Sequence, residues 1–266
     1  MDVRSHFLLC VRQISVGALS LGPQNARHVK AFLLAAGHGT RLRPLTDKIP
    51  KCLAPIRGVP MLEIWLEVCR RAGIDEVLIN LHENAGVVRD ALNEHRNGLE
   101  VRVSEEPVLL GSAGTLLANR EWVDSEPAFW VLYADVLTNT NLTHMINFHE
   151  CGRPAATIGL YKVNDPSRCG IVSFDDQFVV QEFVEKPAIP KSNWAFSGLM
   201  IATPNLLDAI PQRPPVDLGF DVLPRLAGRM LAYPIEDYLL DIGTMENYQV
   251  AQTTWPGLSV NAEADA

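Results

Sequence analysis

The chain has 266 residues, of which 47% are hydrophobic and 20% are charged, and its formal net charge is −8. This composition suits a domain with a large core and excludes extensive disorder. The acidic balance lacks the basic footprint of a general nucleic-acid-binding protein, so we expect no nucleic-acid partner. Five widely spaced cysteines without a C-x-x-C pair argue against a disulfide framework and a zinc site, and favour the cytoplasm.

We expect three segments along the chain. Residues 1–28 are predicted to be an N-terminal extension that is disordered or reflects a mis-assigned start, and the apolar run at 7–11 is too short to cross a membrane. Residues 29–252 are predicted to form the catalytic domain. Residues 253–266 are predicted to be a tail, polar and frayed from Trp255 onward.

The first predicted element is a strand at 29–36, an apolar run ended by Gly37 and typical of a strand buried on both faces. Gly37 and Gly39 allow a tight turn whose N–H groups can approach a ligand, while Thr40 and Arg41 add donors and charge. Neither the P-loop nor the GxGxxG pattern is present. The loop indicates an anion site, although these residues alone would equally fit a tight turn with a solvated basic surface.

The pattern then alternates between helix and strand. Apolar spacing predicts a helix at 60–71 that ends before Gly73, and Asn84 can cap a helix that runs to about residue 95. Further strands are predicted at 76–80, 99–104 and 129–133. This order predicts an α/β fold with a Rossmann-like, doubly wound, mostly parallel sheet, whose ligands bind beyond the carboxyl ends of the strands.

The second half of the chain departs from this alternation. Asn141 can cap a helix to about residue 150, Thr244 can cap the last helix, and Asp221 is expected to cap a short helix. Strands at 156–162, 170–172 and 178–185 predict a small antiparallel insertion, and short helices are expected at 204–210 and 221–227. The seven histidines form no H-x-x-x-H pair, so we assign none of them a role.

Two apolar strands each deliver an aspartate, Asp135 after residues 129–133 and Asp241 after residues 238–240. An aspartate in such a place is most often a turn or cap residue. Only the fold could bring these two carboxylates together.

Residues 34–58 resemble the signature of the sugar-1-phosphate nucleotidyltransferases. L-A-A-G, G-x-G-T-R-L-x-P-L-T and P-K-x-L-x-P-I/V-x-G stand at 34–37, 37–46 and 50–58. Further matches are the base-binding loop at 105–115, the aspartate motif at 134–135, E-K-P at 185–187 and W-x-D-I-G-T at 238–244. Departures are Cys52 for proline, Ala134 for glycine and Tyr238 for tryptophan.

The resemblance implies a set of site residues and a Mg²⁺ cofactor. Catalytic roles fall to Arg41, Lys51 and Lys186, and the metal is held by Asp135 and Asp241. The nucleotide is bound by Leu34, Ala36, Gly37, Gly39, Thr40, Arg41, Glu105, Gly111 and Gly114, and the sugar phosphate by Gly170, Glu185, Lys186 and Ser197.

The implied reaction transfers a nucleoside monophosphate from an NTP to a sugar-1-phosphate and releases pyrophosphate. The L-G-S-A-G loop and the E-K-P motif favour GTP with mannose-1-phosphate. Phe196 stands where guanylyltransferases usually have asparagine and keeps thymidylyl or uridylyl transfer open. A non-catalytic sugar-nucleotide-binding paralogue is a further alternative, although the charged positions are all present. No membrane partner is expected, and a homo-oligomer is left open.

Overall fold

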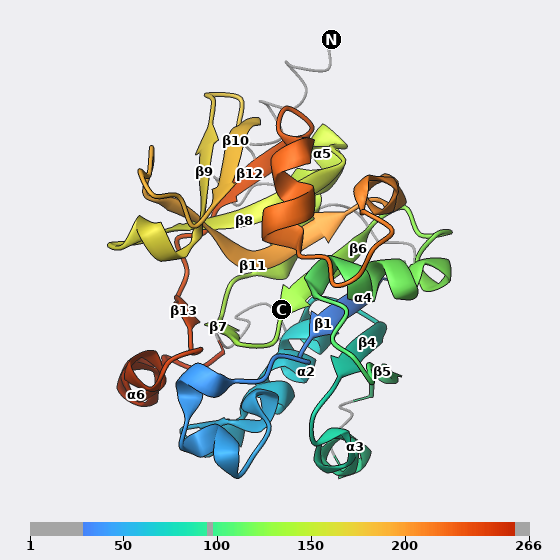
Figure 1. The fold of residues 1–266 in the computed structure, drawn as a ribbon, viewed down its shortest axis with the longest axis vertical. Coiled ribbons are helices and arrows are strands. Elements are labelled where there is room, and N and C mark those ends of the chain that lie inside the picture. The colour runs from blue at the N-terminus through green and yellow to red at the C-terminus, as the bar shows by residue number, and fades with distance from the viewer. Residues whose placement is uncertain (1–28, 95–97, 259–266) are drawn as a thin grey trace, which may run out of the picture.

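The computed structural model describes residues 29–94 and 98–258. The expected N-terminal extension and residues 259–266 of the expected tail lie outside the described residues. A nine-stranded sheet in the order β10-β9-β11-β6-β1-β4-β5, extended by β8 and β12, runs through the molecule (Figure 1).

One half of this sheet is parallel, as the sequence predicts. Its strands are β1 (Lys30–Leu34), β4 (Glu76–Leu81), β5 (Glu100–Glu105) and β6 (Phe129–Tyr133). The helices that link them are α2 (Met61–Arg71), α3 (Ala85–Glu94) and α4 (Ser112–Ala118). The prediction of an α/β fold with a Rossmann-like sheet is confirmed.

Alternate side chains of the central strand explain why helices cover both faces. Ala31 and Leu33 point into the core cluster that includes Trp65 of α2 and Val88 of α3. Phe32 points into the opposite cluster, with Leu116 of α4. Because both faces of β1 are buried, its sequence is apolar throughout.

The antiparallel strands continue the same sheet. They are β8 (Ala156–Lys162), β9 (Gly170–Phe174), β10 (Val180–Glu185) and β11 (Trp194–Ala202), with β12 (Met230–Pro234) parallel to β8. Strand β11 pairs directly with β6, Leu199 opposite Leu132. The predicted insertion is therefore joined to the parallel half through one strand pair.

Two short sheets complete the strand content of the described residues. Strands β2 (Pro55–Ile56) and β3 (Val59–Pro60) form one hairpin. Strands β7 (Val136–Thr138) and β13 (Leu239–Asp241) form the other pair, which ties the segment after β6 to the C-terminal part of the chain. Short 3-10 or π turns occupy 40–42, 45–47, 51–53, 120–122, 166–168, 204–209, 218–222 and 223–226.

Two predicted helix caps are confirmed and one is wrong. The Asn141 side chain accepts from Thr143 N at the start of α5 (Leu142–Gly152), and Thr244 accepts from Asn247 N at the start of α6 (Met245–Thr254). Asp221 was expected to cap the turn near it. The capping oxygen belongs instead to Asp217, which lies before that turn and can reach the N–H of Phe220.

The prediction that Trp255 begins a frayed tail is also wrong. Its side chain is 6% exposed and packs edge-on against Tyr238, with ring centroids 5.2 Å apart. Arg57 donates to its carbonyl oxygen at 3.0 Å. Burial of this large aromatic side chain stabilises the position of the segment that carries it.

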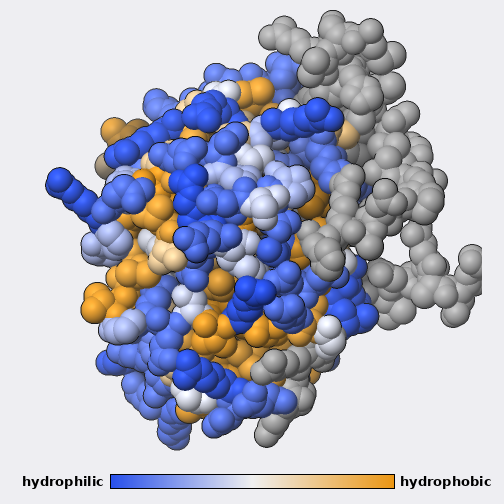
Figure 2. Space-filling model, turned by 90° about the vertical axis from the view of Figure 1, so that its right-hand side faces the viewer, coloured by the Kyte–Doolittle hydropathy of each residue, from blue (hydrophilic) through white to orange (hydrophobic). Residues whose placement is uncertain are grey.

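Most of the surface seen in Figure 2 is hydrophilic, with patches of hydrophobic residues between the hydrophilic ones. Within residues 29–94 and 98–258, none of the helices has both the length and the apolar character needed to cross a membrane. The cytoplasmic location stays a prediction.

Candidate functional site

A cavity of about 280 Å³ opens where β1 and β6 end, at the edge of the sheet where ligands of parallel sheets bind. Its lining includes six residues predicted for the site: Leu34, Ala36, Gly37, Lys51, Gly111 and Asp135. Asn80, Glu106, Ser112 and Tyr133 also line it. Small residues, among them Ala35, Ala36, Gly37 and Gly111, make up about half of this lining.

The glycine loop after β1 is shaped by one backbone position. Gly39 has φ of 64°, in the left-handed region, and a Cβ there would lie 2.9 Å from Thr46 Cγ2 and 3.2 Å from Lys51 Cβ. The Thr46 hydroxyl donates to Gly39 O at 2.8 Å. Glycine at 39 therefore lets the loop lie directly against the segment that carries Lys51.

Two cations and two carboxylates meet beside the cavity. Lys51 Nζ forms an ion pair with Asp135 Oδ2. A Cβ placed on Gly243 would lie 2.7 Å from Asp241 Oδ1, 3.0 Å from Arg41 Nη2 and 3.1 Å from Lys51 Nζ. The space next to Gly243 is thus shared by Asp241 and by two cations from the segment that follows β1.

Backbone pairing between β7 and β13 brings the two aspartates together. Ile242 N donates to Asp135 O at 2.9 Å, and Asp241 lies opposite Val136 in the strand pair. Asp241 is largely buried, and burial, followed by the nearby Asp135 charge, raises the pKa of its carboxyl. Lys51, Gly243 N–H and Arg41 act in the opposite direction.

The loop from Leu110 to Gly114 is held by backbone hydrogen bonds. Val216 N donates to Leu110 O at 2.8 Å, and Ala113 N donates to Val216 O at 2.9 Å. Gly111 has φ of 78°, and a side chain there would collide with the Val216 carbonyl. Packing thus requires glycine at 111, which lines the cavity, whereas Gly114, the other predicted glycine of this loop, is not part of the lining.

The acidic residue predicted for this loop, Glu105, lies outside the cavity. Its carboxylate is exposed and pairs with Arg89 on the surface. The next residue, Glu106, is 2% exposed and lines the cavity. Two adjacent acids at the end of a strand point to opposite sides. The sequence alone therefore does not distinguish which of the two lines the cavity.

Glu106 belongs to a buried hydrogen-bond network that sequence reasoning missed. Its Oε1 accepts from Asn80 Nδ2 at 2.9 Å and from Thr115 Oγ1 at 2.5 Å, and its Oε2 accepts from Leu110 N at 3.0 Å. Asn80 Oδ1 in turn accepts from Ala35 N at 2.7 Å. A single polar residue within the apolar run of β4 was the signal for this network.

The predicted sugar-phosphate residues lie on the antiparallel strands or, for Lys186, directly after β10. Glu185 Oε2 would be 2.7 Å from a Cβ on Gly170, so these two predicted residues are neighbours. Burial, followed by Asp217, raises the pKa of Glu185, while Lys186 counteracts this. Lys186 Nζ is 3.6 Å from Glu185 Oε1 and is more than half exposed.

Ser197 differs from the other predicted sugar residues because it is buried. It is 3% exposed, and its hydroxyl oxygen accepts from Leu199 N at 3.2 Å. A Cβ on Gly159 would lie 2.6 Å from that hydroxyl. The side chain of Ser197 is therefore directed toward Gly159 of the neighbouring strand β8.

Tyr133 links the two halves of the site. It lines the cavity, and its ring packs edge-on against Phe196, with centroids 5.8 Å apart. Burial, followed by the charge of Asp217, raises the pKa of its hydroxyl, and Asp135 and Glu185 act in the same direction. Its hydroxyl is therefore neutral. Asp135, at the end of β6, and Glu185, at the end of β10, both lie in its surroundings.

Residues 30–255 match the family model described as "Nucleotidyl transferase". The chain is 34% identical over 227 residues to the mannose-1-phosphate guanylyltransferase catalytic subunit beta of Xenopus tropicalis, covering 83% of this chain and 62% of that protein. It is 33% identical to mannose-1-phosphate guanylyltransferase 1 of Arabidopsis thaliana, covering 83% and 63%. The chain thus spans less than two thirds of these relatives.

Solved structures show the same fold. HddC from Yersinia pseudotuberculosis matches with a TM-score of 0.74 at 24% identity, covering 85% of this chain and 99% of that one. A putative glucose-1-phosphate thymidylyltransferase from Bacillus anthracis matches with a TM-score of 0.76 at 22% identity, covering 84% and 94%.

Proposed function

The chain belongs to the nucleotidyl transferase family, and we propose that it transfers a nucleoside monophosphate from an NTP to a sugar-1-phosphate. The supporting observation is the convergence of Arg41, Lys51, Asp135 and Asp241 at the rim of the cavity. Cations and carboxylates collected from distant segments are typical of a site that handles phosphates and their metal ion.

The reaction needs positioning and charge neutralisation more than acid–base catalysis. The sugar phosphate oxygen is already an anion and can attack the α-phosphorus in line, with pyrophosphate leaving. Arg41 and the N–H groups of the glycine loop bind the triphosphate. Lys51, held at the cavity rim by Asp135, balances charge on the phosphate that is transferred.

Lys186 and Glu185 serve the second substrate in this proposal. Lys186, whose exposed ammonium group pairs loosely with Glu185, binds the phosphate of the sugar, while Glu185 accepts hydrogen bonds from sugar hydroxyls. The raised pKa of Glu185 reflects its half-buried position beside Asp217. A sugar with several hydroxyl groups would supply the donors that this carboxylate needs.

The two aspartates fit Mg²⁺ as its ligands. Carboxylate oxygens are the donors that Mg²⁺ prefers. Burial, followed by the Asp135 charge, raises the pKa of Asp241. A bound cation would favour the ionised form of this carboxyl. When bound, Mg²⁺ would neutralise charge on the phosphates.

GTP and mannose-1-phosphate are the proposed pair, because the matched relatives of Xenopus and Arabidopsis carry the name mannose-1-phosphate guanylyltransferase. The test is pyrophosphate release with Mg²⁺ across GTP, ATP, CTP, UTP and dTTP against mannose-, glucose- and N-acetylglucosamine-1-phosphate. We expect the fastest release with GTP and mannose-1-phosphate. Release that does not depend on any sugar phosphate, or no release with any pair, would contradict the proposal.

Thymidylyl or uridylyl transfer is the second candidate because of one residue. Phe196, where asparagine is usual in guanylyltransferases, packs against Tyr133 and Phe183 and presents no amide to a sugar. A fastest reaction with dTTP or UTP in the same matrix would favour this candidate. Phe196→Asn would then be expected to lower selectivity between sugar phosphates.

A further inference from the structure

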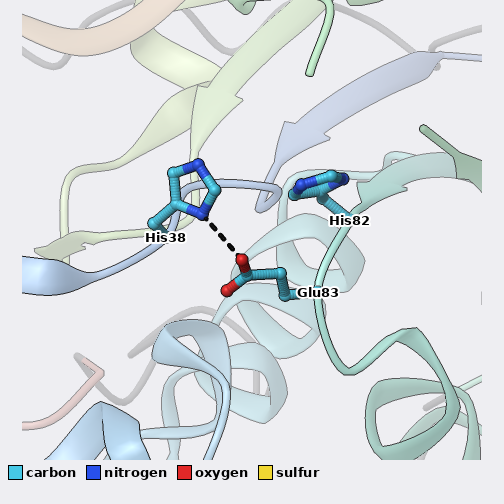
Figure 3. Close-up of side chains that lie close together, drawn as sticks. All are labelled: His38, His82 and Glu83. Atoms are coloured by element: carbon cyan, nitrogen blue, oxygen red, sulfur yellow. Dashed lines mark ion pairs between the residues drawn. The ribbon is translucent and has the colours of Figure 1, made fainter. Parts of the chain in front are cut away.

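Three side chains with metal-binding atoms lie together beside the cavity, apart from the residues proposed for catalysis. His38 belongs to the glycine loop after β1, and His82 and Glu83 follow β4 (Figure 3). One ligand atom from each lies within 4.8 Å of the other two. β1 and β4 are parallel neighbours, with Leu34 opposite Asn80, so the loops that follow them leave the sheet at the same edge.

The hydrogen bond of His82 fixes which ring nitrogen is available. Its Nδ1 lies 2.6 Å from the carbonyl oxygen of Glu106. A carbonyl only accepts, so Nδ1 carries the proton and donates, and Nε2 of the neutral ring keeps its lone pair. Metal-binding histidines commonly donate their other N–H to a carbonyl, which holds the ring in place. His82 therefore already has the supporting contact of a ligand.

His38 and Glu83 are free to rearrange around an ion. His38 Nδ1 lies 3.1 Å from Glu83 Oε1, the contact drawn in Figure 3, and the two side chains are 47% and 61% exposed. A pair this exposed contributes little to stability. The rings of His38 and His82 have centroids only 5.5 Å apart, so small rotations of the exposed side chains can close the three ligands around a cation.

We propose that His38, His82 and Glu83 bind one divalent transition-metal ion of the Zn²⁺ class. Two imidazoles and a carboxylate, with one position left open, are the donor set of many zinc sites. Imidazole selects Zn²⁺, Co²⁺ and Ni²⁺ over Mg²⁺, which prefers oxygen donors. This site is thus chemically different from the pair of aspartates, and the two can be filled independently.

A metal ion bound by His38 and His82 would connect the glycine loop to the loop after β4. Gly37, next to His38, lines the cavity, and Glu106, which supports His82, lines it too. An ion held at His38 and His82 restrains both walls of the cavity at once. We expect Zn²⁺ to slow amide hydrogen exchange in residues 37–40 and 82–84 of the full chain without nucleotide.

Isothermal titration of Zn²⁺ into the metal-free full chain, with no nucleotide present, tests the proposal directly. We expect one site, and we expect His38→Ala and His82→Ala each to weaken it at least about tenfold, since loss of an outer contact alone costs that much. His144→Ala is the matched control, because His144 is exposed on α5 and outside the cluster. Equal Zn²⁺ affinity in all four proteins would overturn the proposal.

Cobalt spectroscopy of the same proteins identifies the ligands. Co²⁺ in this site should give the visible bands of a low-coordinate nitrogen and oxygen site, weakened in Glu83→Gln, which retains the shape of the side chain. A thiolate charge-transfer band would place the metal on cysteine and reject the assignment. Matching thermal melts of the metal-free variants guard against misfolding. Because no nucleotide is used, the outcome does not depend on the transferase proposal.

Discussion

Lys51 and Asp135 form an ion pair although 84 positions of sequence separate them. Their side chains are only 12% and 28% exposed. One arrives on the loop that follows β1 and the other at the end of β6. The pair therefore exists only because these parallel strands are neighbours, Leu34 opposite Tyr133, and it brings a lysine that could otherwise extend into solvent to the cavity wall.

Replacing Lys51 with methionine removes the charge and retains most of the bulk. We expect kcat with the preferred substrate pair to fall on the order of 10²-fold or more, because the charge on the transferring phosphate loses its counter-charge. Steady-state pyrophosphate release measures this. Lys48→Met is the control in the same loop, where the lysine is exposed, and it should keep near-normal turnover. Equal activity of the two variants would contradict the role of Lys51.

Replacing Glu106 with glutamine disturbs the network under the base loop. One carboxylate oxygen becomes an NH₂ group facing donors such as Leu110 N–H, so a buried group loses its partner. We expect a loss of about 1–3 kcal/mol in unfolding free energy and a higher KM for the NTP. Urea unfolding and initial rates measure the two effects. Glu105→Gln, on the exposed side, should leave both quantities nearly unchanged.

Gly39→Ala should lower activity more than an alanine substitution at another glycine with a similar left-handed φ. The left-handed φ costs about 1–2 kcal/mol for alanine, and the new methyl group would also press on Thr46 and Lys51. Gly73→Ala is the matched control, since Gly73 has φ of 69° and open space around it. Similar stability losses with a fall in kcat only for Gly39→Ala would support the prediction. Equal kcat in both would refute it.

His149 makes stability depend on pH. It is 3% exposed, contacts Thr157 Oγ1 at 2.9 Å, and burial lowers its pKa from 6.5 to about 4. The unfolded chain therefore binds a proton that the folded chain excludes, and stability falls as pH drops from about 6.5 to 4. The loss from this group is on the order of 3 kcal/mol. Above the unfolded pKa its contribution is constant.

Urea unfolding at pH 7 and pH 4.5 tests this prediction. His149→Gln lacks the titrating group, so the difference in unfolding free energy between the two pH values should shrink in that variant, whatever its stability at pH 7. His144→Gln removes an exposed histidine and should retain the wild-type difference. An unchanged pH dependence in His149→Gln would show that other groups cause it.

Features that depend on residues close together in the sequence could be predicted from the sequence alone. The glycine loop was predictable because it follows an apolar strand of the parallel sheet, at the edge where ligands bind. Lys51, Asp135 and Asp241 were assigned through the resemblance of their motifs to the family signature, and their roles stay predictions. The caps at Asn141 and Thr244 were predictable because a cap is a contact over two or three residues.

Contacts between distant segments were not predictable in this way. The choice between Glu105 and Glu106 depends on which side chain turns toward Asn80, a residue on another strand. Trp255 is buried because Tyr238 and the core lie beneath it. His38 and His82 have no regular spacing, and only the pairing of β1 with β4 makes them neighbours.

The direct pairing of β6 with β11 has a consequence for how two substrates meet. Tyr133 and Asp135 of the cavity lie at the end of β6, whereas the residues proposed for the sugar phosphate are connected to β6 through β9, β10 and β11. Hydrogen-bonded strands keep a spacing of about 4.8 Å that thermal motion changes little. In the proposed reaction, the pairing of strands within one sheet would therefore fix the distance between the attacking oxygen and the phosphorus, without a hinge between two domains.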